Sequence, residues 1–222
     1  MKDSSIKIVE KPDWVSWDEI HEVVWEAHAN NREKGIIMSY PSLPGEEIKN
    51  MIGDHGKMFL AVEDNKVVGT LALIVKSGKK WYNTGVYGYL CLGAVLPEYS
   101  GKGIYRSLYQ LAESTAKQMN LSVLTRDTNE NNVRMLKITK QEGYHFVAFR
   151  VHEDHCSIIR AKWLNGCPYT DEEINKRYKW SKRLAKWQYK PGRIERSRII
   201  TYICNWFSGH MSTKEFKQIS KE

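Results

Sequence analysis

The stretch LPEYSGKGIYRSLYQL, residues 96–111, has the residue types and spacing best suited to binding a ligand. Gly101 and Gly103 stand between an apolar, strand-like run and an amphipathic, helix-like run. Unpaired N–H groups and the positive end of the macrodipole favour an anion at a helix start, and glycine lets the anion approach the backbone. Lys102 and Arg106 add positive charge. The loop predicts a phosphate site, although a tight strand–helix turn would use the same glycines.

Two common phosphate motifs do not fit this loop. A Walker loop needs GxxxxGK[ST], and the sequence has no match to it. A dinucleotide fingerprint needs GxGxxG, and Arg106 occupies the third glycine position, where close packing requires a small residue. Three antiparallel-looking strands also precede the loop, whereas a Rossmann unit would not begin with them. The remaining phosphate interpretation is a pyrophosphate held by backbone amides at a helix N-terminus.

Both helices and strands are predicted on each side of the loop. Periodicity and turn residues predict helices and strands in the order strand, two helices, three strands, helix, strand, helix, two strands. Ser16 and Glu19 form a candidate capping box, Gly53 and Gly143 are candidate helix ends, and Gly69 is a candidate bulge. The expected strands are 6–9, two runs within 58–76, 86–96, 121–125, 144–151 and 155–164, and the expected helices 16–31, 42–53, 104–119 and 129–143. This order predicts an α+β fold with a mixed, mostly antiparallel central sheet flanked by helices.

Charge divides the chain unevenly. The net charge is +8, and residues from 166 onward hold 13 Lys and Arg against 6 Asp and Glu. The composition changes near Gly166 and Pro168. We therefore predict a near-neutral core domain, 1–165, and a basic helical C-terminal extension, 166–222.

The extension allows three interpretations. Between residues 176 and 198 there are ten Lys and Arg against one Glu, with Tyr178, Trp180, Trp187 and Tyr189 interleaved. Such a helix could dock on the core with a charged outer face, lie on an anionic membrane surface, or contact nucleic acid. All three interpretations remain open from the sequence.

At this point the chain resembles the GCN5-related N-acetyltransferase (GNAT) superfamily, over about residues 6–164. The resemblance rests on four consecutive segments: FLAVEDNKVVGTLAL (59–73), LGAVLPEYSGKGIYRSL (92–108), LSVLT (121–125) and NVRMLKITKQEGYHF (132–146). It implies direct transfer of an acetyl group from acetyl-CoA to an amine, without a covalent enzyme intermediate. In that family the first two helices help to form the acceptor pocket, but the identity of the amine cannot be read from the sequence.

The resemblance also implies a cofactor site. Backbone groups of Gly93, Ala94 and Val95 would bind the pantetheine arm, and a backbone N–H of that strand would polarise the thioester carbonyl. Amides of the loop would bind the pyrophosphate, and Asn132 matches an asparagine that contacts the cofactor, although a helix N-cap explains Asn132 equally well. The loop residues are Ser100, Gly101, Lys102, Gly103, Ile104, Tyr105 and Arg106.

Three positions depart from the family pattern. Ser100 stands at an Arg or Gln position, Tyr105 at a Gly or Ala position, and Thr139 where many relatives have a tyrosine thought to protonate the leaving thiolate. We expect backbone binding to survive the first two, with the Tyr105 ring directed away from the phosphate. The catalytic residues are unassigned, with Thr139 and Tyr144 as weak candidates.

Candidates for the general base are no better defined. Acidic residues near strand ends are Glu63, Asp64 and Asp127, and histidines of the last strand pair are His145, His152 and His155. Each is expected to be a solvated turn or strand residue in the first instance.

The cysteine, histidine and apolar patterns of the sequence bear on the cellular compartment and the binding partners. The four cysteines, Cys91 among them, form no CxxC pair, no histidine spacing indicates a metal, and no apolar run is long enough for a membrane span. We expect a cytoplasmic enzyme with free thiols, with peripheral membrane contact and a homodimer left open. The alternative is a catalytically weak or inactive CoA-binding scaffold whose basic tail binds a membrane surface or nucleic acid.

Overall fold

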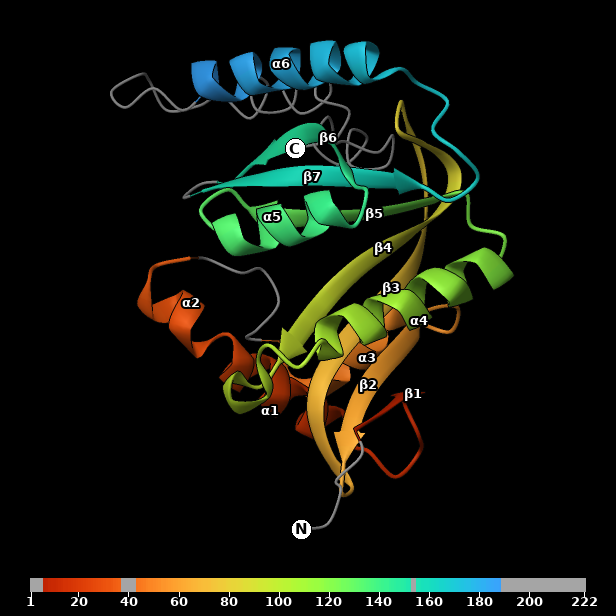
Figure 1. Cartoon of the computed structure of the whole chain (residues 1–222), viewed down its shortest axis with the longest axis vertical. Helices are drawn as coiled ribbons and strands as arrows, with labels where there is room; N and C mark the ends of the chain where they lie inside the picture. The colour runs from red at the N-terminus through yellow and green to blue at the C-terminus, as the bar shows by residue number, and fades with distance from the viewer. Residues whose placement is uncertain (1–5, 37–42, 153–154, 189–222) are drawn as a thin grey trace, which may run out of the picture. The chain divides into compact units, whose positions relative to one another are not determined.

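The structure is a computed structural model that describes residues 6–36, 43–152 and 155–188 (Figure 1). Its strands are β1 (Lys7–Glu10), β2 (Lys57–Glu63), β3 (Lys66–Lys80), β4 (Asn83–Val95), β5 (Val123–Asn129), β6 (His145–Val151) and β7 (Cys156–Trp163). Its helices are α1 (Trp17–Ala27), α2 (Ala29–Glu33), α3 (Gly45–Ile52), α4 (Ile104–Gln118), α5 (Val133–Gln141) and α6 (Asp171–Gln188), with a 3₁₀ turn η1 (Pro97–Tyr99). The part of the predicted extension from residue 189 onward lies outside the described residues.

The strands form a seven-stranded sheet in the order β1-β2-β3-β4-β5-β7-β6. The pairs β1–β2, β2–β3 and β6–β7 are antiparallel. The predicted α+β class, with a mixed sheet flanked by helices, is confirmed. Two compact units divide the chain: residues 1–76 with 88–124, and residues 77–87 with 125–222. A functional boundary at residues 165/166 stays a prediction.

Helix α1 begins as the sequence predicts. The Ser16 hydroxyl accepts a hydrogen bond from the Glu19 N–H at 3.0 Å, which satisfies one unpaired donor of the first turn. The Glu19 carboxylate does not complete the predicted capping box, because it accepts from the Val67 N–H at 3.3 Å. The cap therefore also fastens the helix to the start of β3.

The β2–β3 hairpin has a two-residue turn at Asp64 and Asn65. Asp64 and Asn65 both adopt positive φ angles of 47° and 62°, which two-residue hairpin turns of type I′ require and which Asp and Asn tolerate. The register then shifts: Ala61 pairs with Gly69 but Val62 pairs with Val67, so Val68 is an extra residue. The bulge expected at Gly69 thus lies beside it.

The first unit has its core between the sheet and helices α1, α3 and α4. Helix α4 packs on β2 and β1, and α1 packs on α3. Their inward side chains are fully buried, including Ile20, Ile48, Leu60, Leu71 and Leu108. These apolar positions follow the helical and strand periods that the sequence displays, and burying them stabilises the fold by about 1.5–3 kcal/mol for each large side chain.

In the second unit, α6 packs on β6 (Figure 1). Ile174 is buried, Tyr178 stacks on Phe149 with ring centroids 5.4 Å apart, and the Ser181 hydroxyl accepts from the Phe149 N–H at 3.0 Å. Trp180 and the neighbouring lysines face solvent. Of the three interpretations of the extension, docking with a charged outer face is therefore confirmed for the described part of α6.

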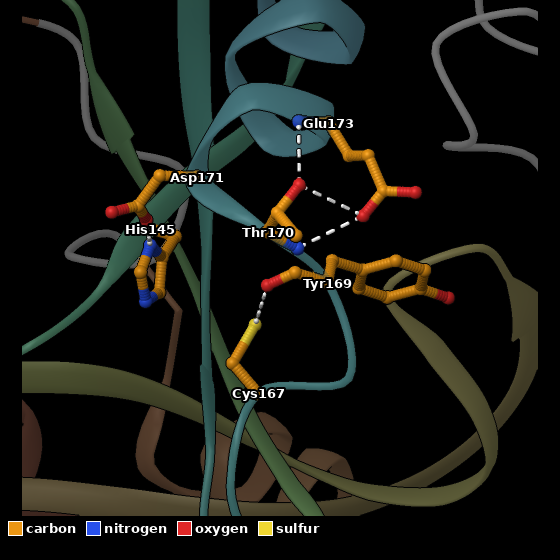
Figure 2. A network of polar contacts seen from close by, with 6 residues as sticks. All are labelled: His145, Cys167, Tyr169, Thr170, Asp171 and Glu173. Carbon is orange, nitrogen blue, oxygen red and sulfur yellow. Dashed lines mark hydrogen bonds and ion pairs between the residues drawn. The ribbon is translucent and has the colours of Figure 1, made fainter.

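Helix α6 begins with a capping box that the sequence analysis did not name. Figure 2 shows Thr170 accepting from the Glu173 N–H (3.3 Å) while Glu173 accepts from the Thr170 N–H (2.9 Å) and hydroxyl (3.0 Å). Those two donors lower the pKa of the Glu173 carboxyl below its ordinary value. Nδ1 of His145 in β6 also lies 3.7 Å from a carboxylate oxygen of Asp171, an ion pair when the ring is protonated. The sequence TDEE carries the S/T-x-x-E signature, so this helix start was readable.

Other predicted boundaries shift modestly. The expected helix 16–31 is divided at His28 into α1 and the short α2, whose residues ANNRE have no apolar periodicity that would indicate a separate helix. Strand β5 continues to Asn129, beyond the apolar run that ends at Thr125. No helix in the described part of the chain is long and apolar enough to cross a membrane.

Candidate functional site

The loop between β4 and α4 has a backbone open to a ligand. Gly101 and Gly103 adopt left-handed φ angles of 83° and 78°, which favour glycine. A Cβ placed on either residue would meet no described heavy atom within 4 Å. The two glycines are therefore required by backbone conformation, and the space beside them is available to a bound group.

Helix α4 starts directly at this loop. Gly103 is its N-cap residue, and the first helical hydrogen bond runs from the Ser107 N–H to the Gly103 carbonyl at 3.1 Å. The helix offers no internal acceptor to the N–H groups of residues 104–106, and glycine has no side chain with which to cap them. With the macrodipole, these amides form the kind of anion site that a pyrophosphate fits.

Side chains around the loop support its start. Tyr99 donates to the Glu63 carboxylate at 2.6 Å, which raises the pKa of the Tyr99 phenol, and Lys102 lies over the Tyr99 ring, 4.6 Å from its centroid. The Ser100 N–H donates to the Pro97 carbonyl at 3.0 Å. That amide is already used in the turn, so a contribution of Ser100 to phosphate binding would come from its side chain.

Strand β4 is irregular where the pantetheine arm is expected. Leu92 has a φ of 52°, which an L-residue adopts at a cost. The buried Thr70 hydroxyl donates to the Leu92 carbonyl at 2.7 Å. The Leu92 carbonyl is therefore the acceptor of a side-chain hydrogen bond from β3, and this bond fixes the backbone just before Gly93.

Tyr105 lies against the same stretch of β4. A Cβ on Gly93 would be 3.0 Å from Cε2 of Tyr105 and 3.3 Å from Cδ1 of Leu71. The tyrosine ring is thus directed to the strand, and a side chain at position 93 would require the Tyr105 ring to shift by a few tenths of an ångström. Tyr105, which departs from the family pattern, therefore packs closely against Gly93 of β4.

A functional candidate that sequence reasoning missed also reaches Gly93. His28, at the junction of α1 and α2, is 8% exposed and forms a hydrogen bond with the Gly93 backbone. Burial, aided by the Arg32 charge, lowers the pKa of its imidazole to about 4. Nothing in the local sequence HANN announces this role, because the partner lies on a distant strand.

The remaining predicted residues, Asn132, Thr139 and Tyr144, belong to the second unit. Asn132 caps α5, since its side chain accepts from the Met135 N–H at 3.2 Å. The buried Thr139 hydroxyl donates to carbonyls of its own helix, at 2.9 Å to Met135 and 3.2 Å to Leu136. Tyr144 follows directly, with its N–H donating to the Thr139 carbonyl at 3.1 Å, and is itself buried.

The candidate bases have structural partners. Glu63 accepts from Tyr99, and Asp127 pairs with Arg150 at 3.4 Å, whereas Asp64 occupies the exposed hairpin turn. The ring of His152 stacks on that of His155 at 4.1 Å. These contacts give Glu63, Asp127 and the two histidines structural partners, and they assign no general base. His155 is buried, at 8% exposed, whereas the sequence predicted a solvated residue.

One hollow lies beside the helices expected to bind the acceptor. It has a volume of about 580 Å³, and residues of α1 and α3 are among those that line it. None of the predicted cofactor residues lines it. Both charge signs occur on its walls, which are formed by Glu10, Lys11, Asp13, Trp17, Lys49, Asn50, Ile52, Gly53, Asp54, Gly56, Lys57 and Met58. Among the described residues, no three metal-binding side chains gather at one point.

Solved structures provide an independent comparison. An acetyltransferase of the GNAT family from Staphylococcus aureus Mu50 is similar over 72% of this chain and 99% of its own, with TM-score 0.57 and 19% identity. The ribosomal-protein-S18-alanine N-acetyltransferase from Escherichia coli is similar over 75% and 98%, with TM-score 0.55 and 14% identity. A GNAT acetyltransferase from Elizabethkingia anophelis, solved with acetyl-CoA bound, is similar over 73% and 99%, with TM-score 0.52 and 16% identity. At such identities these similarities establish the fold.

Sequence comparison is more specific. No curated protein matches the chain. The family model described as the acetyltransferase (GNAT) family matches residues 17–144, more than half of the sequence, and this span includes β4, the glycine loop, α4 and α5. The chain therefore belongs to the acetyltransferase (GNAT) family.

Proposed function

We propose that the chain is an acetyl-CoA-dependent N-acetyltransferase that transfers an acetyl group directly to an amine. The observation that carries this proposal is the loop at the start of α4. Its left-handed glycines and the N-terminal turn of α4, whose first amides have no acceptor within the helix, follow an irregular strand, β4, in the order that the family resemblance implies. Family membership and the acetyl-CoA complex of one structural relative support the choice of cosubstrate.

Different parts of the chain would bind different parts of acetyl-CoA. Amides of Gly101 to Arg106, with Lys102, would bind the pyrophosphate, and backbone groups of Gly93 to Val95 would bind the pantetheine arm. Bound acetyl-CoA supplies the acetyl thioester. The chain would orient it, hold a neutral amine beside it and provide an N–H donor to the carbonyl.

The proton donor is a separate question within this proposal. We favour Tyr144 over Thr139, because the Thr139 hydroxyl donates to its own helix. A phenol is also a much stronger acid than an aliphatic alcohol. Asn132 would contact the cofactor only with groups that the helix cap does not use.

Thermal unfolding tests the cofactor assignment. Titration with acetyl-CoA or CoA should raise the melting temperature of the full chain saturably, whereas NAD at the same concentrations should not. Equal shifts with all three compounds, or no shift with the CoA compounds, would contradict the proposal. Release of free CoA thiol in the presence of an amine would then establish turnover.

The acceptor class is part of the same proposal. The Escherichia coli relative is named for an alanine of ribosomal protein S18, so a peptide with N-terminal alanine belongs in the first panel, beside small amines and amino sugars. A CoA-release rate that depends on one class and saturates with its concentration would identify it. The sequence left a homodimer open, and a mass measurement in solution tests for it.

The compartment follows from thiol chemistry. Cys91 and Cys156 are buried free thiols, and Cys167 is an exposed free thiol. Unpaired thiols of this kind are typical of a reducing compartment, so we propose the cytoplasm.

Contact with an anionic surface is a secondary proposal for α6. Its apolar side is docked on β6, and after the exposed acidic first turn, residues 171–173, most of the exposed side chains are cations, beside Trp180, which is 59% exposed. Replacing Lys176, Lys179 and Arg183 with glutamine should weaken salt-sensitive binding to RNA or anionic liposomes if this face binds polyanions. Unchanged binding to both probes would remove the proposal and leave acetyl transfer untouched.

A further inference from the structure

His28 is a buried polar residue that the proposed reaction does not use. It ends α1 and precedes α2, with a backbone φ of −99° and ψ of 7°, and its carbonyl accepts from the N–H groups of Asn31 (3.0 Å) and Arg32 (3.1 Å). The side chain is 8% exposed. A buried polar ring costs stability unless its nitrogens form hydrogen bonds. The hydrogen-bond partners of His28 therefore indicate its structural role.

The partners define the tautomer of the ring. The Asn31 side-chain amide lies 3.1 Å from Nδ1 of His28 through its nitrogen, Nδ2, which can only donate. Nδ1 is therefore the acceptor, and in the neutral ring the proton is on Nε2. The hydrogen bond to the Gly93 backbone favours the protonated ring, as a bond to a carbonyl does. His28 thus donates from Nε2 to the Gly93 carbonyl.

The ring is neutral under ordinary conditions. Burial is the main cause of its low pKa, and the Arg32 guanidinium, which stacks on Trp25 at 3.7 Å, is the second. A neutral imidazole with one proton and one lone pair can satisfy Asn31 and Gly93 together. Because both nitrogens are occupied in this way, His28 is not arranged as a general base.

Thr70 makes a parallel contact one residue earlier. Its hydroxyl donates to the Leu92 carbonyl at 2.7 Å, so the carbonyls of Leu92 and Gly93 are each bonded to a buried side chain. A trans peptide group is planar, and its C=O and N–H point in opposite directions. Fixing the Leu92 carbonyl therefore fixes the Gly93 N–H, and fixing the Gly93 carbonyl fixes the Ala94 N–H.

We propose that His28 and Thr70 are positioning residues that hold two successive peptide groups of β4 in the orientation needed to bind and polarise the acyl thioester of acetyl-CoA. This inference rests on the proposed function. Leu92 is in a left-handed conformation that would relax if unsupported, so the support must come from side chains such as these. Asn31 contributes by fixing the tautomer and angle of the His28 ring.

Conservative and disruptive variants test the inference in pairs. His28→Gln keeps an N–H donor near the Nε2 position, whereas His28→Leu removes it; Thr70→Ser keeps the hydroxyl, whereas Thr70→Val removes it at equal volume. His28→Asn, which can still accept from Asn31 but cannot reach Gly93, replaces His28→Leu if the leucine variant fails to fold. Melting temperatures without ligand establish that each variant is folded.

Two binding probes separate positioning from general damage. Calorimetry with acetyl-CoA should give a Kd about fivefold to tenfold higher for His28→Leu and Thr70→Val, which corresponds to the loss of about one hydrogen bond. The Gln and Ser variants should remain within about threefold of the wild type. Adenosine 3′-phosphate 5′-diphosphate, which has no pantetheine arm, should bind all of them alike.

The carbonyl itself supplies a spectroscopic readout. The ¹³C signal of acetyl-CoA labelled at the thioester carbonyl should shift on binding to the wild type, and the shift should shrink in His28→Leu and Thr70→Val but return in His28→Gln and Thr70→Ser. Wild-type affinity and an unchanged carbonyl shift in the disruptive variants would overturn the inference. So would an equal loss of affinity for both probes. Failure of the wild type to bind acetyl-CoA would instead overturn the proposed function, and the inference with it.

Discussion

The β4–α4 loop and helix α5 were both expected to contact acetyl-CoA, but they use their polar groups in opposite ways. In the first unit, backbone groups are presented by left-handed glycines and a helix start without a side-chain cap, and side chains such as Thr70 support them. In the second unit, the side chains of Asn132 and Thr139 bond the backbone of their own helix.

This difference explains which departures from the family pattern matter. A site made of backbone amides tolerates Ser100 and Tyr105, because neither change removes an N–H group. A site made of side chains depends on residue identity, and at position 139 the hydroxyl is already committed. We therefore expect the affinity for acetyl-CoA to depend mainly on the loop. Residues Asn132 and Thr139 are expected to affect mainly the stability of α5.

The sharpest way to break the comparison is to block the loop. Gly103→Glu places a side chain on a left-handed residue and a negative charge beside the proposed pyrophosphate site. We expect the affinity for acetyl-CoA to fall at least about a hundredfold, equivalent to about 3 kcal/mol, measured by calorimetry. Gly85→Glu is the matched control, since Gly85 also has a left-handed φ and open space around it but lies near the start of β4, in the second unit. Similar loss in both variants would contradict a local role for Gly103.

The next largest effect concerns the side chain that supports β4. The His28 pKa is about 4 in the folded chain and 6.5 when unfolded, so between these values the unfolded chain binds a proton that the folded chain does not. Stability should therefore fall as the pH drops below 6.5, by about 2 kcal/mol at pH 5. Urea unfolding of the wild type and His28→Gln at pH 7.5 and pH 5 isolates this contribution, because other titrating groups are shared. Equal pH dependence in the two proteins would show that the ring is not buried and neutral.

A smaller effect is expected at the cap of α5. Asn132→Ala should destabilise the chain by about 1 kcal/mol, because the Met135 N–H loses its acceptor. Asn132→Ser keeps a capping oxygen and should restore most of that stability, as measured by urea unfolding. If the serine variant is stable but binds acetyl-CoA much more weakly, then Asn132 contacts the cofactor as well as capping the helix.

The smallest effect is expected at Thr139. Thr139→Val preserves shape and removes a hydroxyl whose acceptors belong to the same helix, so stability should change by less than about 1 kcal/mol. Affinity for acetyl-CoA should not change. A large fall in turnover, once an acceptor is known, would show that the hydroxyl takes part in the reaction, and Thr139→Ser should then retain activity.

The sequence predicted most of the architecture because its signals are local. Ser16 at the start of α1, Gly53 at the end of α3, Asp64 and Asn65 in the hairpin turn, and Gly103 before α4 each act through the conformation of their immediate neighbours. Apolar periodicity then separates helices from strands. These are the features that a single sequence carries explicitly.

What the sequence could not supply are contacts between distant segments. His28 is an unremarkable histidine until its ring reaches Gly93, and Glu19 fits a capping box until its carboxylate reaches Val67. The left-handed Leu92 is likewise invisible, because leucine gives no propensity for that conformation. Such features arise when tertiary packing overrides local preference, and they concentrate where β4 is irregular.

The contacts of α6 have a practical consequence for trimming the protein. The Tyr169 hydroxyl donates to the Trp81 carbonyl, Arg177 lies 4.7 Å above the Trp81 ring, and Tyr178 covers Phe149. A protease cut or stop codon after Leu164 would remove these groups and leave aromatic faces of β6 and of the β3–β4 turn region in water. A shortened chain should therefore keep residues through the end of α6. Comparing the solubility of chains that end after Leu164 and after α6 would reveal how far the extension serves as part of the core.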